Sequence, residues 1–173
     1  MPTFTDKAAC HNATLPFTRN VVGPMDYTPC AFSDSQNPHI TSNAHELALT
    51  VLFESALQHL ADRPESLLAQ PQEVQEFFGK LPAAWDETKF VAGYPGEYAV
   101  VARKKGNTWY IGGINGKNEN LSANIDLSFI QNAKTIQAFF DADNESKWSI
   151  ENPESLPKTI EMTPRGGFVL VVE

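Results

Sequence analysis

A single carboxylate, Asp26, stands inside an apolar stretch at residues 21–29, and Arg19 lies shortly before it. The stretch is typical of a short buried strand that carries polar groups at its C-terminal end. Barrels of alternating strands and helices place their substrate-shaping residues at that end. Asp26, Arg19 and His11 are therefore candidates for the rim of a substrate pocket. Alternatively, Asp26 is a buried acid that accepts backbone N–H groups and holds the following loop.

The other acids and metal-binding residue types form no catalytic pattern. Glu46 and Glu54 are two helical turns apart, a separation of about 12 Å along one helix face. The carboxylates of a glycoside hydrolase lie closer together, so this pair is expected on a solvated helix face. Zinc ligands have a short spacing that the histidines lack: His11, His39, His45 and His59. The spacing predicts no metal site made from this chain alone.

The two cysteines, Cys10 and Cys30, could close a disulfide loop of about twenty residues. Two thiols without a secretory signal do not make a disulfide framework, which leaves their pairing open. The start, Met-Pro-Thr-Phe-Thr-Asp-Lys, lacks the basic and then apolar layout of a signal peptide. No apolar run reaches the roughly 18 residues of a membrane span. We expect no membrane-spanning segment.

Composition narrows the class of protein and of partner. Of 173 residues, 42% are hydrophobic, which is enough for a sizeable core. The 21 acidic and 13 basic residues give a formal net charge of −8, whereas nucleic-acid binding needs clustered Lys and Arg. The basic run Arg103-Lys104-Lys105 precedes Gly106-Asn107 and is typical of a solvated hairpin tip. We therefore expect no nucleic-acid partner.

The elements that would position the rim residues come before residue 84, where the signals are helical. Apolar residues recur every three or four positions over residues 44–61, which predicts an amphipathic helix. Asn43 and Glu46 predict its N-terminal cap, and Pro64 marks its end. A shorter helix is predicted over residues 71–79. The strand at 21–29, the loop and the long helix would together make one unit of an α/β barrel.

The second half of the chain has strand signals. Short runs rich in Val, Ile and aromatic residues predict seven strands, at 89–92, 98–103, 108–114, 122–127, 135–141, 159–163 and 168–172. This spacing indicates an antiparallel sandwich. A hairpin is predicted around Gly106-Asn107, with Trp109 and Tyr110 on opposite faces. Gly112-Gly113 lies inside a strand run and fits a bulge or close packing, not a phosphate loop or a nucleophile elbow.

Three segments closely resemble the C-terminal third of glycoside hydrolase family 97: PFTRNVVGPMDYTPCAF, HELALTVLFESALQHLAD and LPAAWDETKFVAGYPGEYAVVARKKGNTWYIGGING. Members of that family are α-glucosidases or α-galactosidases with an N-terminal β-super-sandwich, a central (β/α)8 barrel and a C-terminal β-sandwich. The resemblance implies an α+β fragment. Residues 1–63 would be the last strand and helix of the barrel, 64–83 a helical connector, and 84–173 an antiparallel all-β sandwich with a possible role in homo-oligomer contacts.

The resemblance also implies a function in carbohydrate catabolism. The intact enzyme would be exo-acting on an oligosaccharide, would bind calcium, and would be periplasmic or secreted in bacteria. The family's catalytic and calcium-binding glutamates belong to segments upstream of Met1, so the acids here take none of those roles. Glycoside cleavage needs two carboxyl groups flanking the scissile bond. We therefore expect the chain alone to be inactive and to bind no calcium by itself, with Asp26, Arg19 and His11 shaping the pocket without doing the chemistry.

Two other classes of protein remain as alternatives. A stand-alone carbohydrate-binding sandwich would need aromatic side chains along one face, for which Trp85, Tyr94, Trp109 and Trp148 are available. A structural interaction domain would instead use strand edges and the loop at residues 93–96 to contact another subunit. Only the interaction domain predicts a defined assembly in the absence of sugar.

Overall fold

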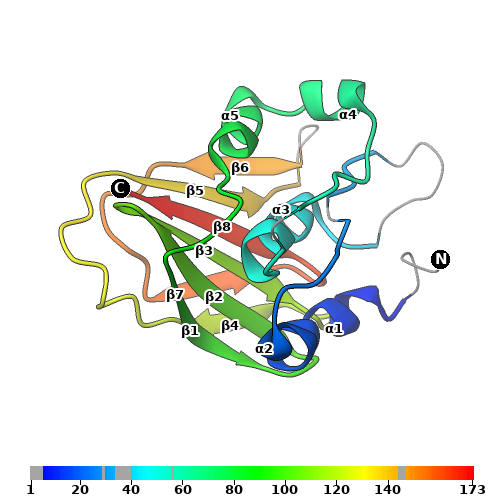
Figure 1. Cartoon of the computed structure of the whole chain (residues 1–173), viewed down its shortest axis with the longest axis horizontal. Coiled ribbons are helices and arrows are strands. Elements are labelled where there is room, and N and C mark those ends of the chain that lie inside the picture. The colour runs from blue at the N-terminus through cyan, green and yellow to red at the C-terminus, as the bar shows by residue number, and fades with distance from the viewer. Residues whose placement is uncertain (1–5, 29, 34–39, 56, 144–146) are drawn as a thin grey trace.

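A six-stranded antiparallel sheet forms the centre of the computed structural model, which describes residues 6–28, 30–33, 40–55, 57–143 and 147–173 (Figure 1). Its strands, in spatial order, are β1 (Glu87–Tyr94), β2 (Tyr98–Lys105), β3 (Thr108–Asn115), β8 (Gly167–Val172), β5 (Ile136–Asp141) and β6 (Trp148–Glu151). A separate antiparallel pair consists of β4 (Leu121–Asn124) and β7 (Thr159–Met162). The helical elements precede the strands: α1 (Ala8–Asn12), η1 (Leu15–Phe17), α2 (Arg19–Val22), α3 (Asn43–Leu52), α4 (Pro64–Leu68) and α5 (Gln72–Lys80). Within the described ranges, no helix is long and apolar enough to cross a membrane.

The antiparallel all-β part of the prediction is confirmed. All seven predicted strands are present with shifted ends, and the short strand β6, which the sequence reading missed, adds an eighth. The predicted hairpin is the β2–β3 pair, which turns at Gly106 with a positive φ of 58°. Its two aromatic residues do face opposite sides: Trp109 packs toward β4 and β7, and Tyr110 packs toward the helices.

Two adjacent glycines in β3 make room for side chains on opposite faces of the sheet, Leu52 of α3 on one face and Phe168 of the paired strand β8 on the other. A Cβ atom on Gly112 would lie 2.9 Å from Leu52 of α3, and one on Gly113 would lie 2.1 Å from the ring of Phe168. These distances are shorter than side chains tolerate, so close packing is the correct one of the two predictions for this pair. Helix α3 therefore rests directly on β3.

The long predicted helix is real but shorter. Helix α3 spans Asn43–Leu52 rather than residues 44–61. Its N-cap is Ser42, whose hydroxyl accepts the backbone N–H of His45, so the prediction of Asn43 as the cap was wrong by one residue. Phe53 has extended backbone angles and ends the helix. The helix at 71–79 is confirmed as α5, one residue displaced.

The strand predicted at residues 21–29 is wrong over residues 21–28, and Pro29 lies outside the described residues. Val21 and Val22 belong to the short helix α2, and their exposed fractions are 72% and 86%. A strand needs neighbours for its N–H and C=O groups, and the described part of this stretch has one isolated bridge, between Tyr27 and Gln58. The Glu54 carbonyl accepts the N–H of Met25, so the chain after α3 runs beside this stretch instead of continuing as a helix.

Two cores lie on the two faces of the large sheet. One core joins α3, α5 and the N-terminal residues to the inner face, through side chains such as Leu47, Phe77 and Phe139. The other is enclosed by β4 and β7 and contains Ile111 and Phe168. Helix α3 thus shares a core with the sheet, while the assignment of residues 1–63 to a barrel and 64–83 to a connector stays a prediction.

Candidate functional site

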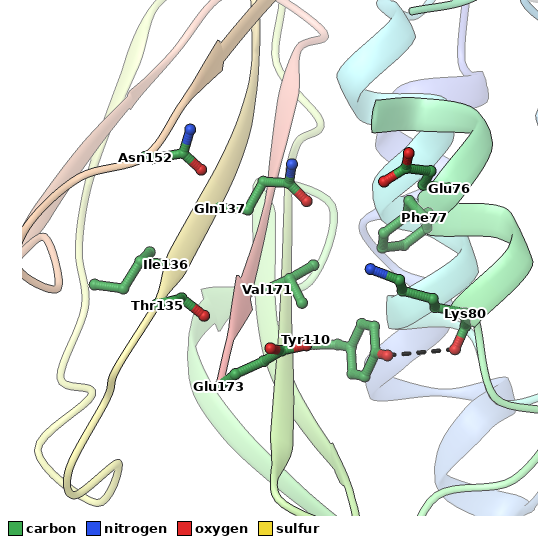
Figure 2. A pocket seen from close by; sticks show the side chains of 10 residues that line it. All are labelled: Glu76, Phe77, Lys80, Tyr110, Thr135, Ile136, Gln137, Asn152, Val171 and Glu173. Carbon is green, nitrogen blue, oxygen red and sulfur yellow. Dashed lines mark hydrogen bonds between the residues drawn. The ribbon is translucent and has the colours of Figure 1, made fainter. Parts of the chain in front are cut away.

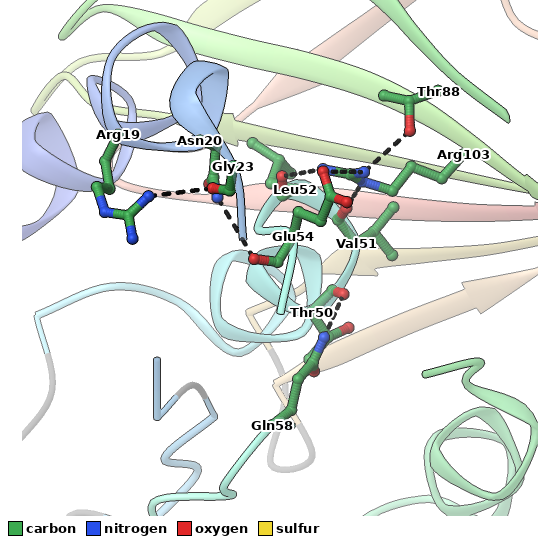
Figure 3. Close-up of polar contacts among 10 residues, drawn as sticks. All are labelled: Arg19, Asn20, Gly23, Thr50, Val51, Leu52, Glu54, Gln58, Thr88 and Arg103. Atoms are coloured by element: carbon green, nitrogen blue, oxygen red, sulfur yellow. Dashed lines mark hydrogen bonds and ion pairs between the residues drawn. The ribbon is translucent and has the colours of Figure 1, made fainter. Parts of the chain in front are cut away.

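The three predicted rim residues lie on the surface of the N-terminal segment, and no hydrogen bond or ion pair of the described residues joins them. His11, Arg19 and Asp26 are all exposed. The Arg19 guanidinium donates to the Gly23 carbonyl at 3.1 Å (Figure 3). It also donates to the Pro24 carbonyl at 3.0 Å, instead of pairing with Asp26. Within the described ranges the Asp26 carboxylate accepts no hydrogen bond, so the alternative of a buried, loop-holding acid is wrong. A role at a pocket rim stays a prediction.

The chain after α3 runs beside the segment that carries Asp26. The Glu54 carbonyl accepts the side-chain amide of Asn20 at 3.4 Å (Figure 3). It also accepts the N–H of Met25 at 2.9 Å. Gln58 returns to the helix and donates to the Thr50 carbonyl at 2.9 Å. These contacts fix the two segments relative to α3, so the position of Asp26 depends on that helix.

Two charged side chains of the sheet hold the ends of α3, and the first is Asp141 at the end of β5. Its carboxylate accepts the N–H of Ala44 at 3.0 Å and the hydroxyl of Ser42 at 2.7 Å. It also accepts the N–H of Gly167 in β8 at 3.0 Å. A negative charge at a helix N-terminus satisfies free N–H groups and complements the helix dipole. Sequence reasoning missed Asp141 because nearly a hundred residues separate it from the helix.

The second is Arg103 on β2, which the sequence reading placed at a solvated hairpin tip. That prediction is wrong for Arg103, whose exposed fraction is 4%. Its guanidinium donates to the carbonyls of Val51 and Leu52 at 2.6 and 3.0 Å, and Glu54 lies 3.7 Å away (Figure 3). Burial lowers the pKa of Arg103 and the Glu54 carboxylate opposes this shift. The positively charged Arg103 therefore caps the C-terminus of α3.

A buried histidine ties α1 to the sheet through α3. His45 has no exposed surface. Its Nδ1 lies 3.2 Å from the Gly166 carbonyl, which can only accept, so Nδ1 carries the proton. Its Nε2 then accepts the amide of Asn12 at 3.1 Å. His45 is therefore a buried core residue whose two ring nitrogens are both hydrogen-bonded.

Two carboxylates organise residues 30–33. Glu46, predicted on a solvated helix face, accepts the backbone N–H of Cys30 and of Ala31 at 3.2 and 3.4 Å, and that prediction is wrong. Asp62 accepts the N–H of Phe32 and both the N–H and hydroxyl of Ser33. Both acids therefore serve as backbone anchors rather than as a catalytic pair.

The electrostatics of this cluster keep its groups inert. Burial would raise the pKa of Asp62, but hydrogen bonds from Ser66, Ser33 and two backbone N–H groups outweigh burial and lower it to about 2. Burial raises the pKa of the Cys30 thiol, and Glu46 raises it further. Cys30 is thus a protonated, buried thiol; it and the exposed Cys10 are both free.

Neither a metal centre nor an aromatic platform can be built from the described residues. Across the described ranges, no group of three His, Cys, Asp or Glu side chains could hold a metal ion, so the calcium implied for the family cannot be assigned to them. Of the four candidate aromatics, Trp109 and Trp148 are buried, and Trp85 packs edge-on against Tyr110. Tyr94 alone of the four is largely exposed, at 64%.

Two curated enzymes are similar in sequence. Over 105 residues, which are 61% of this chain and 16% of the relative, the chain is 55% identical to a probable retaining α-galactosidase of Streptomyces bingchenggensis. Over 181 aligned positions, covering 94% of this chain and 27% of the relative, it is 30% identical to the retaining α-galactosidase of Bacteroides thetaiotaomicron.

Solved structures extend the similarity to nearly the whole chain. A β-arabinopyranosidase matches 96% of this chain at 31% identity with a TM-score of 0.86. A glycoside hydrolase family 97 enzyme from Pseudoalteromonas sp. strain K8, in complex with panose, matches 95% at 29% identity with a TM-score of 0.84. In each case this chain spans 28% of the length of the solved protein.

The family model for the C-terminal domain of glycosyl hydrolase 97, described as an oligomerisation domain, matches residues 84–173. Those residues are the part of the chain that begins just before β1 and contains every strand of both sheets. The chain therefore belongs to glycoside hydrolase family 97, and its sheet is the C-terminal domain of that family.

Proposed function

We propose that this chain is the C-terminal part of a retaining α-galactosidase, in which residues 84–173 join copies of the enzyme. The observation that carries the proposal is the 55% identity to a probable retaining α-galactosidase. The 94% coverage in the second α-galactosidase extends the similarity upstream of residue 84 and supports residues 1–63 as the end of the catalytic barrel. An α-glucosidase is the second choice, because the relative that binds panose is less similar in sequence.

The proposed reaction needs groups that this chain would receive from the rest of the enzyme. A retaining glycosidase uses one carboxylic acid to protonate the leaving oxygen and a second carboxylate about 5 Å away as the nucleophile. Glu46 and Asp62 are occupied by backbone N–H groups, which makes them unsuitable for either role. The part of the chain around α3 would instead support the barrel, and Asp26, Arg19 and His11 would lie near its rim. Calcium would be held by upstream glutamates.

The proposed contact between copies involves β1. Within residues 84–173, the exposed large apolar side chains of the described ranges are Phe90 and Tyr94, at 61% and 64%. Both are on β1, an edge strand with one unpaired side. Phe90 lies opposite Val101 and Tyr94 opposite Tyr98, with a register shift between them, so they emerge on opposite faces of the sheet. A substitution of each residue therefore tests whether the contact between copies uses that face of the sheet.

The experiment is to purify the chain and measure its mass in solution by light scattering across a range of concentrations, without sugar. We expect a defined assembly that Phe90→Ser or Tyr94→Ser weakens, whereas the exposed Lys105→Ser does not. A monomer at every concentration would contradict the oligomer contact.

A parallel assay with 4-nitrophenyl α-galactoside, with and without calcium, tests the missing catalytic groups. We expect no hydrolysis by the chain alone. Hydrolysis that disappears in Asp26→Asn would show that the chemistry is carried by this chain and would overturn the proposal.

A further inference from the structure

A hollow of about 200 Å³ lies between α5 and the inner face of the sheet (Figure 2). The apolar side chains on the helix side of the hollow are Phe77 and Val171. Phe77 is buried, with an exposed fraction of 4%, and Val171 is partly buried. The Tyr110 hydroxyl donates to the Lys80 carbonyl at 3.3 Å and holds the last turn of α5 against β3. The hollow is therefore a preformed feature of the packed helix and sheet.

The rim of the hollow is polar and has unused hydrogen-bonding groups. It includes the ammonium of Lys80, the amides of Gln137 and Asn152, the hydroxyl of Thr135 and the carboxylate of Glu173. Throughout the described ranges, none of these five side chains makes a hydrogen bond or ion pair with another protein group. Figure 2 shows Lys80 and Gln137 between the helix and the sheet, directed into this space from opposite sides.

The lining selects a class of ligand by its chemistry. An anion would face the carboxylates of Glu76 and Glu173 as well as the single ammonium of Lys80. A metal cation would lack a cluster of three ligating groups within the described ranges. A wholly apolar ligand would leave the polar rim unpaired. A neutral molecule with many hydroxyl groups and one apolar face satisfies both the rim and the apolar side chains.

We propose that this hollow binds one pyranose ring of an oligosaccharide. The C–H face of the ring would lie on Phe77 and Val171, while its hydroxyls exchange hydrogen bonds with Lys80, Gln137 and Asn152. Drug-sized ligands occupy pockets of about 300–1,000 Å³, so the smaller volume here fits a single ring. This site differs from an aromatic stacking platform because the rings beneath it are buried. The choice of a galactoside as the sugar rests on the proposed function, but the presence of the site does not.

The test is ligand-observed saturation-transfer NMR on the purified chain with melibiose, and with maltose in a parallel sample. We expect saturation transfer to one sugar ring and a dissociation constant on the order of 1 mM, because few hydrogen bonds form in a shallow site. Gln137→Leu and Asn152→Ala should each weaken binding about three- to ten-fold, the effect of one lost hydrogen bond. Their side chains have no protein partner, so melting temperatures should not change. Gln131→Leu, an exposed glutamine outside the hollow, is the matched control.

The outcomes separate this site from the proposed function. Binding of melibiose that both variants weaken supports the site and the galactoside preference. Binding of maltose alone supports the site and counts against the α-galactosidase assignment. Binding unaffected by either variant, or no binding of either sugar, overturns the site while leaving the oligomer and activity assays as they stand. A change of assembly state in Gln137→Leu would identify the hollow as a contact between copies and would also overturn it.

Discussion

The two faces of the central sheet are covered in different ways. On the face toward β4 and β7, the contacts are between apolar side chains, and Trp109, Ile111 and Phe168 fill the space. On the other face, α3 is held by apolar contacts and also by charged groups at both ends, Asp141 at its N-terminus and Arg103 at its C-terminus. The face toward β4 and β7 is therefore covered by apolar packing.

The two kinds of contact differ in how well they fix the orientation of the element that covers the face. Apolar packing is non-directional and fixes distance better than orientation. Hydrogen bonds from fixed side chains to helix ends set the axial position and direction of a helix. Because α3 carries His45 and Glu46, which hold the N-terminal segment, the orientation of α3 determines where Asp26 lies. The charged residues of the sheet orient α3, and α3 in turn positions the segment that carries Asp26.

Loss of Arg103 should have the largest effect. Arg103→Met keeps an apolar stem but leaves the buried carbonyls of Val51 and Leu52 without donors, and should lower the free energy of unfolding by about 3 kcal/mol. Lys105→Met is the matched control, because its ion pair with Asp86 is exposed and screened by solvent, so its loss should change the stability little. Urea denaturation of both variants measures the difference. Equal losses would show that the helix face does not depend on this polar contact.

Substitutions at the two adjacent glycines, Gly112 and Gly113, compare how tightly the two faces of the sheet are packed. Gly113→Ala places a methyl group against the Phe168 ring in the fully buried face and should cost about 2 kcal/mol. Gly112→Ala meets Leu52, Val51 and the Ala48 carbonyl of α3 at 2.9, 3.0 and 3.1 Å, a milder overlap than the 2.1 Å at Gly113, and should cost about 1 kcal/mol. Urea denaturation gives the two energies, and near-ultraviolet circular dichroism should report the Trp109 environment in the Gly113 variant. A larger cost for Gly112→Ala would reverse the assignment of the tighter face.

The smallest expected effect is a pH dependence through Asp62. Its pKa is about 2 in the folded chain and 3.8 ordinarily, so its stabilisation is present above about pH 4 and is lost as the pH falls toward 2. The group is partly exposed, so we expect about 1 kcal/mol. Asp62→Asn should therefore reduce the difference in unfolding free energy between pH 5 and pH 2.5. The exposed Asp143→Asn is the control, and identical pH profiles for the two variants would contradict the role of Asp62.

The sequence by itself determined the parts of the molecule that local patterns specify. The seven predicted strands, the Gly106 turn and helix α5 follow from alternation, turn residues and proline position. The resemblance in the sequence also identified the family, which the family model confirmed. These features depend on residues that are close together in the chain.

Tertiary structure decided where α3 ends, whether residues 21–29 pair as a strand, and which charged residues are buried. Arg103 was misread as solvated because its partners, Val51 and Leu52, lie some fifty residues away. Asp141 was missed for the same reason. A periodic pattern reports which face of a segment is apolar, but it does not report which distant group satisfies a helix end. That choice is made only when the sheet and the helix meet.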